Sequence, residues 1–136
     1  MTRFFYPTPA AALLSLLLVN LVLPEPSRAQ PAGLEGSWSG GGVVSFASGA
    51  RERARCRAHY SRRSSTTYVL SATCATASGR ATQSASLRNV GGNSYQGSFY
   101  NSEYNISGTI YVVVRGNRQS VQLSSSAGSA SLQLSR

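Results

Sequence analysis

The sequence predicts an all-β protein, and the fold that accounts best for the pattern is a small eight-stranded antiparallel up-and-down barrel. Turn-forming residues such as Gly, Ser and Asn recur at intervals of roughly ten residues. Apolar and polar side chains alternate between these turns, as in strands with one buried face. Ser, Thr, Tyr and Val dominate the same region, which favours strand over helix. A β-sandwich fits the same pattern and is the alternative, but barrel closure leaves no exposed strand edge.

The N-terminal segment is typical of a secretory signal. Arg3 precedes an apolar stretch at 10–23, and the small residues Ser27 and Ala29 follow in a polar segment. The apolar stretch is shorter than the ~20 residues that span a bilayer as a helix. We therefore expect a signal peptide at 1–29, a single mature domain at 30–136, no transmembrane segment in that domain, and a periplasmic or extracellular location.

The turn signals divide the mature chain into eight strand-forming runs. The predicted strands are 35–46, 51–60, 66–76, 80–89, 94–101, 104–115, 118–125 and 129–136.

The two cysteines predict a disulfide and a strand register. In 51–60 the residues Ala54, Cys56, Ala58 and Tyr60 share one face, and in the next run Tyr68, Leu70, Ala72 and Cys74 share one face. An antiparallel register that pairs Cys56 with Cys74 also pairs 58 with 72 and 60 with 70. An exported compartment permits such a bridge. No metal or cofactor site is expected, because His59 is the only histidine and aspartate is absent.

The inward-facing residues leave the state of the interior open. Bulky residues, including Phe46, alternate with small ones such as Gly97 and Gly108. Either large side chains pack over small ones, or small ones line a pocket for one apolar ligand. The rings that would surround such a pocket are Trp38, Tyr60, Tyr68, Tyr95 and Phe99. An outer-membrane barrel is disfavoured, since it needs longer strands and aromatic girdles.

The distribution of charged residues suggests which surface of the protein contacts a partner. Loss of the signal leaves eleven arginines against three glutamates, a net charge of +8 without any lysine. Arg51, Arg53, Arg55 and Arg57 fall on the outward face of one strand, with Arg62 and Arg63 at the following turn. Guanidinium groups bind phosphate, sulfate and carboxylate well. Candidate partners are lipopolysaccharide, anionic lipid, acidic polysaccharide or an acidic protein, and nucleic acid is not expected after export. The alternatives are a solvated arginine face, partly neutralised by Glu52 and Glu103, and a bias from GC-rich codons.

Catalysis is not expected. Three glutamates and one histidine offer few groups for acid–base work, and no serine has a predicted histidine and acid beside it. The sequence therefore favours an exported, non-catalytic binding protein whose arginine-rich strand face contacts anionic envelope components.

Three resemblances accompany these patterns. Gly36 and Trp38 form a G-x-W pattern that resembles the first strand of lipocalins and other calycins, which implies that Arg136 packs across Trp38 and that the barrel could carry a small apolar ligand. The runs ERARCRAHY at 52–60 and RGNRQSV at 115–121 resemble small exported bacterial β-barrel proteins, which implies export, the bridge and the β fold but no reaction. The closing L-x-L-x-R at 132–136 is similar to that of periplasmic metalloprotease inhibitors, which implies inhibition through the N-terminal segment.

Overall fold

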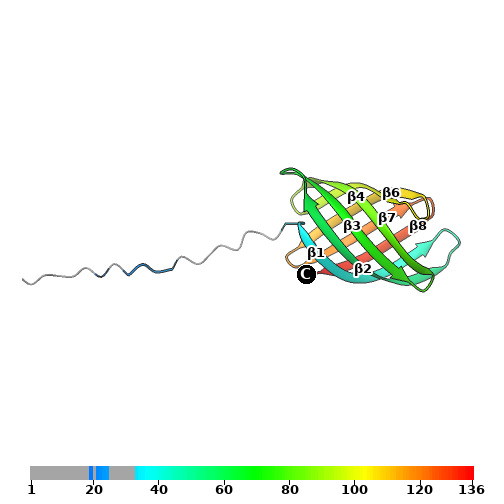
Figure 1. Ribbon diagram of the computed structural model, residues 1–136, viewed down its shortest axis with the longest axis horizontal. Helices are drawn as coiled ribbons and strands as arrows, with labels where there is room; N and C mark the ends of the chain where they lie inside the picture. The colour runs from blue at the N-terminus through cyan, green and yellow to red at the C-terminus, as the bar shows by residue number, and fades with distance from the viewer. Residues whose placement is uncertain (1–18, 20, 25–32) are drawn as a thin grey trace, which may run out of the picture.

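The protein is a closed antiparallel β-barrel of eight strands (Figure 1). A computed structural model describes residues 19, 21–24 and 33–136, and its described part contains no helix. The strands are β1 (Gly36–Phe46), β2 (Arg51–Arg62), β3 (Thr67–Thr76), β4 (Gly79–Gly91), β5 (Ser94–Asn101), β6 (Ile106–Arg115), β7 (Arg118–Ser125) and β8 (Gly128–Ser135). Each strand pairs with the next and β8 closes on β1, so the predicted barrel is confirmed and the sandwich is wrong. The predicted cleavage site and most of the predicted signal lie outside the described residues.

The register between β2 and β3 is the one that the cysteines predicted. Cys56 lies opposite Cys74, Ala58 opposite Ala72 and Tyr60 opposite Leu70. The disulfide forms between Cys56 and Cys74, whose Cα atoms are 4.1 Å apart. It joins the inward faces of neighbouring strands, so it restricts the unfolded chain without rearranging the sheet.

Removing this bridge is expected to destabilise the barrel without changing its fold. The cysteines are 18 positions apart, and closing a loop of that length in the unfolded state is worth about 3 kcal/mol. The double variant Cys56→Ala, Cys74→Ala should therefore lose about 3 kcal/mol in urea unfolding relative to the oxidised protein. A loss below about 1 kcal/mol would show that the bridge contributes little to stability.

The strand boundaries differ from the predicted ones by at most two residues, and the physical reason is plain at the turn between β5 and β6. The side-chain Oδ1 of Asn101 accepts hydrogen bonds from the backbone N–H groups of Glu103 and Tyr104, at 3.0 and 3.2 Å. Asn105 then adopts the left-handed conformation with φ 51°, which Asn tolerates better than most residues. The chain therefore turns until Asn105, and β6 begins at Ile106 instead of residue 104.

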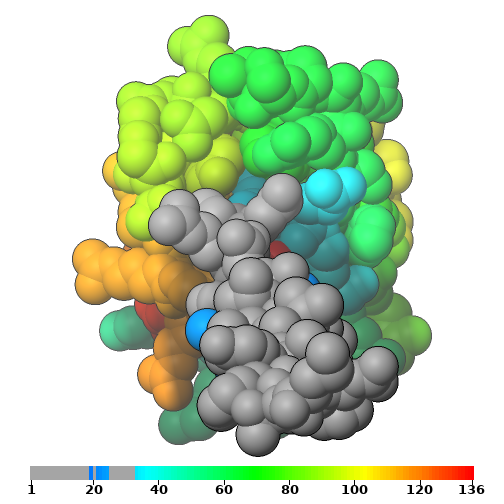
Figure 2. Space-filling view, turned by 90° about the vertical axis from the view of Figure 1, so that its left-hand side faces the viewer, coloured from blue at the N-terminus to red at the C-terminus, as the bar shows by residue number. Residues whose placement is uncertain are grey.

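The up-and-down path gives the barrel two different ends. At the end that we call the Trp38 end lie the start of β1, the end of β8 and the turns at 63–66, 92–93 and 116–117. In Figure 1 the C-terminus lies beside the start of β1, and Figure 2 looks onto this end, with the β4–β5 turn in yellow-green and the β6–β7 turn in orange. The opposite end, which we call the open end, carries the turns at 47–50, 77–78, 102–105 and 126–127.

The interior is a continuous apolar core made by alternate residues of every strand, as the alternation predicted. Its largest fully buried apolar members are Trp38, Tyr60, Leu34, Leu87, Ile110 and Val112. Two small inward residues, Gly97 and Gly108, do not leave room for a ligand. A Cβ atom at Gly97 would lie 1.7 Å from the Ser86 carbonyl oxygen, and one at Gly108 would lie 2.0 Å from that of Ser124. Glycine at these positions lets neighbouring strands approach closely.

Candidate binding sites at the open end and on the arginine face

The Trp38 end is closed by interlocking side chains. Trp38 is buried, and its indole Nε1 donates a hydrogen bond of 2.9 Å to the carbonyl oxygen of Leu34, whose own side chain is fully buried. The guanidinium carbon of Arg136 lies 4.2 Å from the centroid of the Trp38 ring, a cation–π contact. Arg136 also donates a 2.8 Å hydrogen bond to the Glu35 carbonyl oxygen. The structure thus brings together Trp38 and Arg136, the pair that the calycin resemblance implied.

A buried polar pair lies below this closure. The Tyr60 hydroxyl donates a 2.7 Å hydrogen bond to Oε1 of Gln119, and both side chains are almost completely buried. Burial raises the pKa of the Tyr60 hydroxyl far above its usual value, because the phenolate would be desolvated. Gln119 was missed as an interior residue, although it shares parity with the buried residues Val121 and Leu123. Alternation on β7 was the signal that could have placed it.

The buried Tyr60 predicts a loss of stability in strong alkali. In the unfolded chain the hydroxyl titrates near its usual value of 10, whereas the folded protein keeps its proton to higher pH. The unfolded state therefore binds fewer protons above about pH 10, and the free energy of unfolding should fall by up to about 1.4 kcal/mol per pH unit. Below pH 10 this contribution is constant. Urea unfolding between pH 8 and 11 should show a shallower alkaline slope for Tyr60→Phe, and an equal slope would contradict the assignment.

The open end of the barrel contains a pocket. It has a volume of about 460 Å³ and is lined mainly by apolar side chains that point inward from several strands. The apolar lining residues are Val44, Phe46, Cys74, Ala81, Phe99, Tyr104, Ile106, Leu123, Ala127 and Ala130. Below it the interior space is only about 20 Å³, so the rest of the barrel is filled. A concave, apolar space of this size is what small-ligand sites require.

Most of the aromatic rings that were predicted to surround a pocket lie at the opposite end of the barrel from the pocket. Trp38, Tyr60, Tyr68 and Tyr95 are buried core residues towards the Trp38 end, where Tyr68 and Tyr95 pack edge to face with centroids 5.4 Å apart. Only Phe99 reaches the pocket, where it forms part of the floor. Phe46, predicted to face inward, ends β1 at the pocket mouth and is 36% exposed. The pocket forms at the open end because small residues such as Ala81, Ala127 and Ala130 line the interior there.

Polar groups occur at two levels of the pocket. Gln83 lies at the floor, since it lines both the pocket and the small space below it. At the rim, the Ser78 hydroxyl donates to Oε1 of Glu52. Hydrogen bonds from the hydroxyls of Ser78 and Thr76 hold the pKa of the Glu52 carboxyl below its ordinary value. The carboxyl is therefore ionised at neutral pH.

The predicted arginine-rich strand face lies on the outer wall, on the opposite side of β2 from the core. Arg51, Arg53, Arg55 and Arg57 are all exposed and alternate with inward-facing residues. We call these four residues the arginine face. The residues opposite Arg55 are Gly41 on β1 and Ala75 on β3, and those opposite Arg57 are Ser39 and Thr73. Neutral neighbours therefore flank the centre of the face.

The two glutamates expected to neutralise this face lie elsewhere. Glu52 is on the inward row of β2, where it accepts a hydrogen bond from the pocket residue Ser78, and an oxygen of Glu103 accepts a 3.3 Å hydrogen bond from the backbone N–H of Thr82. Sequence reasoning also missed a basic neighbour. Ala75 lies opposite both Arg55 and Arg80, so Arg80 on β4 extends the basic surface across the short side chain of Ala75.

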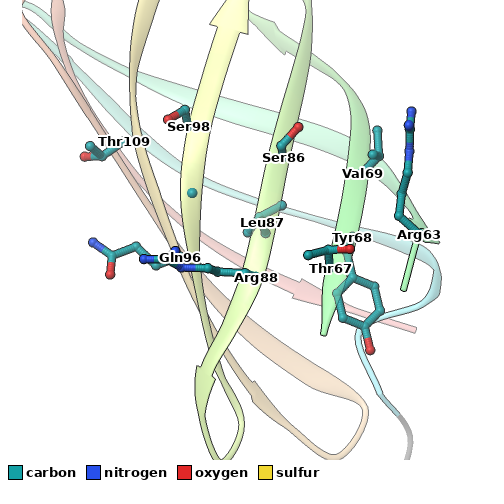
Figure 3. Close-up of a pocket in the computed structure, with 11 residues that line it drawn as sticks. Arg63, Thr67, Tyr68, Val69, Ser86, Leu87, Arg88, Gln96, Ser98 and Thr109 are labelled. Carbon is teal, nitrogen blue, oxygen red and sulfur yellow. The ribbon is translucent and has the colours of Figure 1, made fainter. Parts of the chain in front are cut away.

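Arg62 and Arg63 do not continue the arginine face. Arg62 lies at the Trp38 end, where it donates a 3.0 Å hydrogen bond to the Tyr68 hydroxyl and stacks 5.6 Å from the centroid of that ring. Arg63 borders a shallow groove of about 650 Å³ on a different part of the outer wall (Figure 3). Arg88 on β4 also lines this groove. In this groove Val69, Ser86, Ser98 and Thr109 lie side by side across four strands. Because these side chains are short, the outer surface is lower there and forms the groove.

The only histidine forms a surface hydrogen bond. The His59 Nδ1 atom lies 3.0 Å from the Ser37 hydroxyl on the outer wall, and both groups are exposed. Within 33–136, no hydrogen bond joins His59 to a carboxylate that would orient it as a base.

Among the described residues, no three His, Cys, Asp or Glu side chains gather in a way that could hold a metal ion. The described part of the chain also has no helix long and apolar enough to cross a membrane.

These features define a closed eight-stranded β-barrel that is filled at one end and hollow at the other. The chain matches no protein-family model and no curated protein. Among solved structures it is similar to designed barrels. The redesigned β-barrel mFAP1, bound to DFHBI, has a TM-score of 0.65 at 16% identity, covering 76% of this chain and 94% of that one. A fluorescence-activating β-barrel of de novo design has a TM-score of 0.59 at 16% identity, covering 75% of this chain and 92% of that one. At this identity the likeness shows the shared fold alone.

Proposed function

We propose that the protein is an exported, non-catalytic binding protein that holds a small, largely apolar ligand in the open end of its barrel. The observation that carries the proposal is the contrast between the two halves of the interior: a pocket of about 460 Å³ at one end and only about 20 Å³ of free space in the filled remainder. A filled core serves stability, whereas an apolar pocket that reaches the surface costs packing and suits a ligand. Apolar burial would supply most of the affinity.

Titration with a neutral apolar dye tests this function. N-phenyl-1-naphthylamine emits more strongly in apolar surroundings, so binding in the pocket should raise its fluorescence with a saturating, one-to-one curve. Because the driving force is burial of apolar surface, affinity should change little between low and high salt. A signal that does not saturate, or none at all, would count against the pocket as a binding site.

A second function rests on a separate observation, the neutral surroundings of the arginine face. Four guanidinium groups on one strand repel one another, and Arg80 adds a fifth across Ala75. An anion that bridges them relieves this repulsion. Anionic envelope components, such as lipopolysaccharide, anionic lipid or acidic polysaccharide, have the repeated negative charges that would match. The two functions use different surfaces, since the pocket opens at the barrel end and the arginines lie on the wall.

The inhibitor alternative receives less support. It needs an N-terminal segment free to enter a protease, but Leu34 is fully buried and its carbonyl oxygen accepts the Trp38 indole hydrogen bond. The Glu35 carbonyl oxygen is likewise bonded to Arg136. Any inhibitory segment would have to end before Leu34.

A further inference from the structure

Asn101, the last residue of β5, is a buried polar residue in the lining of the open-end pocket. It belongs to the inward row of its strand and is only 4% exposed. Its Oδ1 accepts the two hydrogen bonds that shape the following turn, from the backbone N–H groups of Glu103 and Tyr104. An amide nitrogen cannot accept such bonds, so the orientation of this amide is fixed. Nδ2 is therefore the atom that can donate elsewhere.

Nδ2 of Asn101 has no acceptor among the described residues, in contrast to a second asparagine in a similar turn. Oδ1 of Asn89 accepts a 2.9 Å hydrogen bond from the Gly91 N–H, and its Nδ2 donates a 3.0 Å hydrogen bond to the Gly92 carbonyl oxygen. In Asn101 only Oδ1 is used in this way. Unlike Nε2 of Gln119, which is sealed in the core, Nδ2 of Asn101 is not closed off from open space. Since buried donors nearly always have acceptors, it marks a place for one.

A second amide lies next to Asn101. Gln83 is on the inward row of β4 and lines the same pocket. Ser84 of β4 lies opposite Tyr100 of β5, and Gln83 and Asn101 are the next residues along these two strands. Because both belong to inward rows, the two side chains lie on the same side of the pocket.

The lining offers no opposite charge to an ionised ligand. None of the described residues that line the pocket carries a charge. An ion without a partner is costly to bury, so the lining favours an uncharged ligand. Nδ2 of Asn101 is a donor, so the polar atom of that ligand has to be an acceptor.

We infer that the ligand of the open-end pocket is an uncharged carbonyl compound with an apolar chain, whose carbonyl oxygen accepts a hydrogen bond from Nδ2 of Asn101. This inference rests on the proposed function, because it names the chemical class of ligand for that pocket. A carbonyl oxygen has two lone pairs and brings no donor of its own. Its second lone pair is available to the neighbouring amide of Gln83, while the apolar chain fills the rest of the pocket.

A ketone and its hydrocarbon isostere test the inference. Octan-2-one and 2-methyloct-1-ene have nearly the same shape, but the alkene carries a CH₂ group where the ketone has its oxygen. Each is titrated into the mature protein loaded with N-phenyl-1-naphthylamine, and displacement of the dye is followed by fluorescence. The ratio of the two Kd values then reports the hydrogen bond to the oxygen, because both ligands share the same apolar chain.

The variant Asn101→Asp keeps the oxygen that accepts the turn hydrogen bonds and replaces the Nδ2 donor by a carboxylate oxygen. The ketone oxygen would then face another acceptor, so the ratio of the ketone Kd to the alkene Kd should rise by at least about tenfold. The control Asn89→Asp makes the same change in the β4–β5 turn, at the Trp38 end, and should leave the ratio as it is in the wild type.

An unchanged ratio in Asn101→Asp, or an equal rise in Asn89→Asp, would overturn the inference but leave the pocket intact. If Asn101→Asp does not fold, the infrared carbonyl stretch of octan-2-one bound to the wild type decides. A hydrogen-bonded carbonyl absorbs at lower frequency than the same ketone in hexane, whereas a stretch at the hexane frequency would overturn the inference. Absence of dye binding to the wild type would overturn the proposed function itself.

Discussion

An aromatic side chain introduced at Ala81 is expected to abolish ligand binding at the open end while the barrel stays folded. Ala81 lines the pocket from β4, and its side chain is only half-buried because it faces that space. A phenyl ring there would occupy the volume that the ligand needs. Ala81→Phe should therefore weaken binding of N-phenyl-1-naphthylamine by at least tenfold, which corresponds to about 1.4 kcal/mol. The measurement is the same fluorescence titration.

A matched control separates occlusion from general damage. Ser84 lies on the same strand as Ala81, but its side chain is exposed on the outer wall. Ser84→Phe adds the same ring outside the pocket and should leave the affinity for the dye unchanged. Thermal unfolding of both variants shows whether they are folded. If Ala81→Phe binds the dye as tightly as wild type, the dye binds elsewhere and the pocket is not the site.

Loss of the central arginines is expected to remove binding to polyanions. The triple variant Arg53→Gln, Arg55→Gln, Arg57→Gln takes three charges from the arginine face, where the residues opposite Arg55 and Arg57 are neutral and cannot replace the lost charge. On immobilised heparin and on lipopolysaccharide the wild type should be retained beyond ~0.3 M salt, and the triple variant should elute well below it. The elution salt concentration is the measured quantity.

A second triple variant tests whether position or total charge matters. Arg88, Arg115 and Arg118 are exposed and lie away from β2, on β4, β6 and β7. Changing all three to Gln lowers the net charge equally, and this variant should keep most of the wild-type retention. Equal losses in the two triple variants would mean that net charge alone governs binding, and the arginine face would then be an ordinary solvated surface.

The open-end pocket and the arginine face are separate surfaces, so each can bind independently of the other. The pocket is expected to be insensitive to salt, because its affinity comes from apolar burial, whereas the arginine face is expected to lose affinity as salt screens its charges. A protein that passes both would carry a small ligand and attach to an anionic surface at once.

Alternation along each strand was enough to predict much of this structure. Because successive side chains of a strand point to opposite faces, Cys56 and Cys74 could be placed on the inward rows of adjacent strands, and their register followed from matching apolar partners. The same argument placed Arg51 to Arg57 on the outer wall. These features depend on the alternation within one strand and on the short turn to the next strand. Both can be read from a short stretch of the sequence.

The difference between the two ends could not be derived in this way, because it depends on side chains that are distant in the sequence. The Trp38 end is closed by Arg136, which bonds to the Glu35 carbonyl 101 positions away, and by Tyr60, which bonds to Gln119 59 positions away. The open end is hollow because small residues from β4, β8 and the 126–127 turn meet there. Strand periodicity thus determined which side chains face inward, the disulfide and the arginine face. Only barrel closure decided where the interior is filled and where the pocket opens, since these outcomes depend on how eight strands meet around one axis.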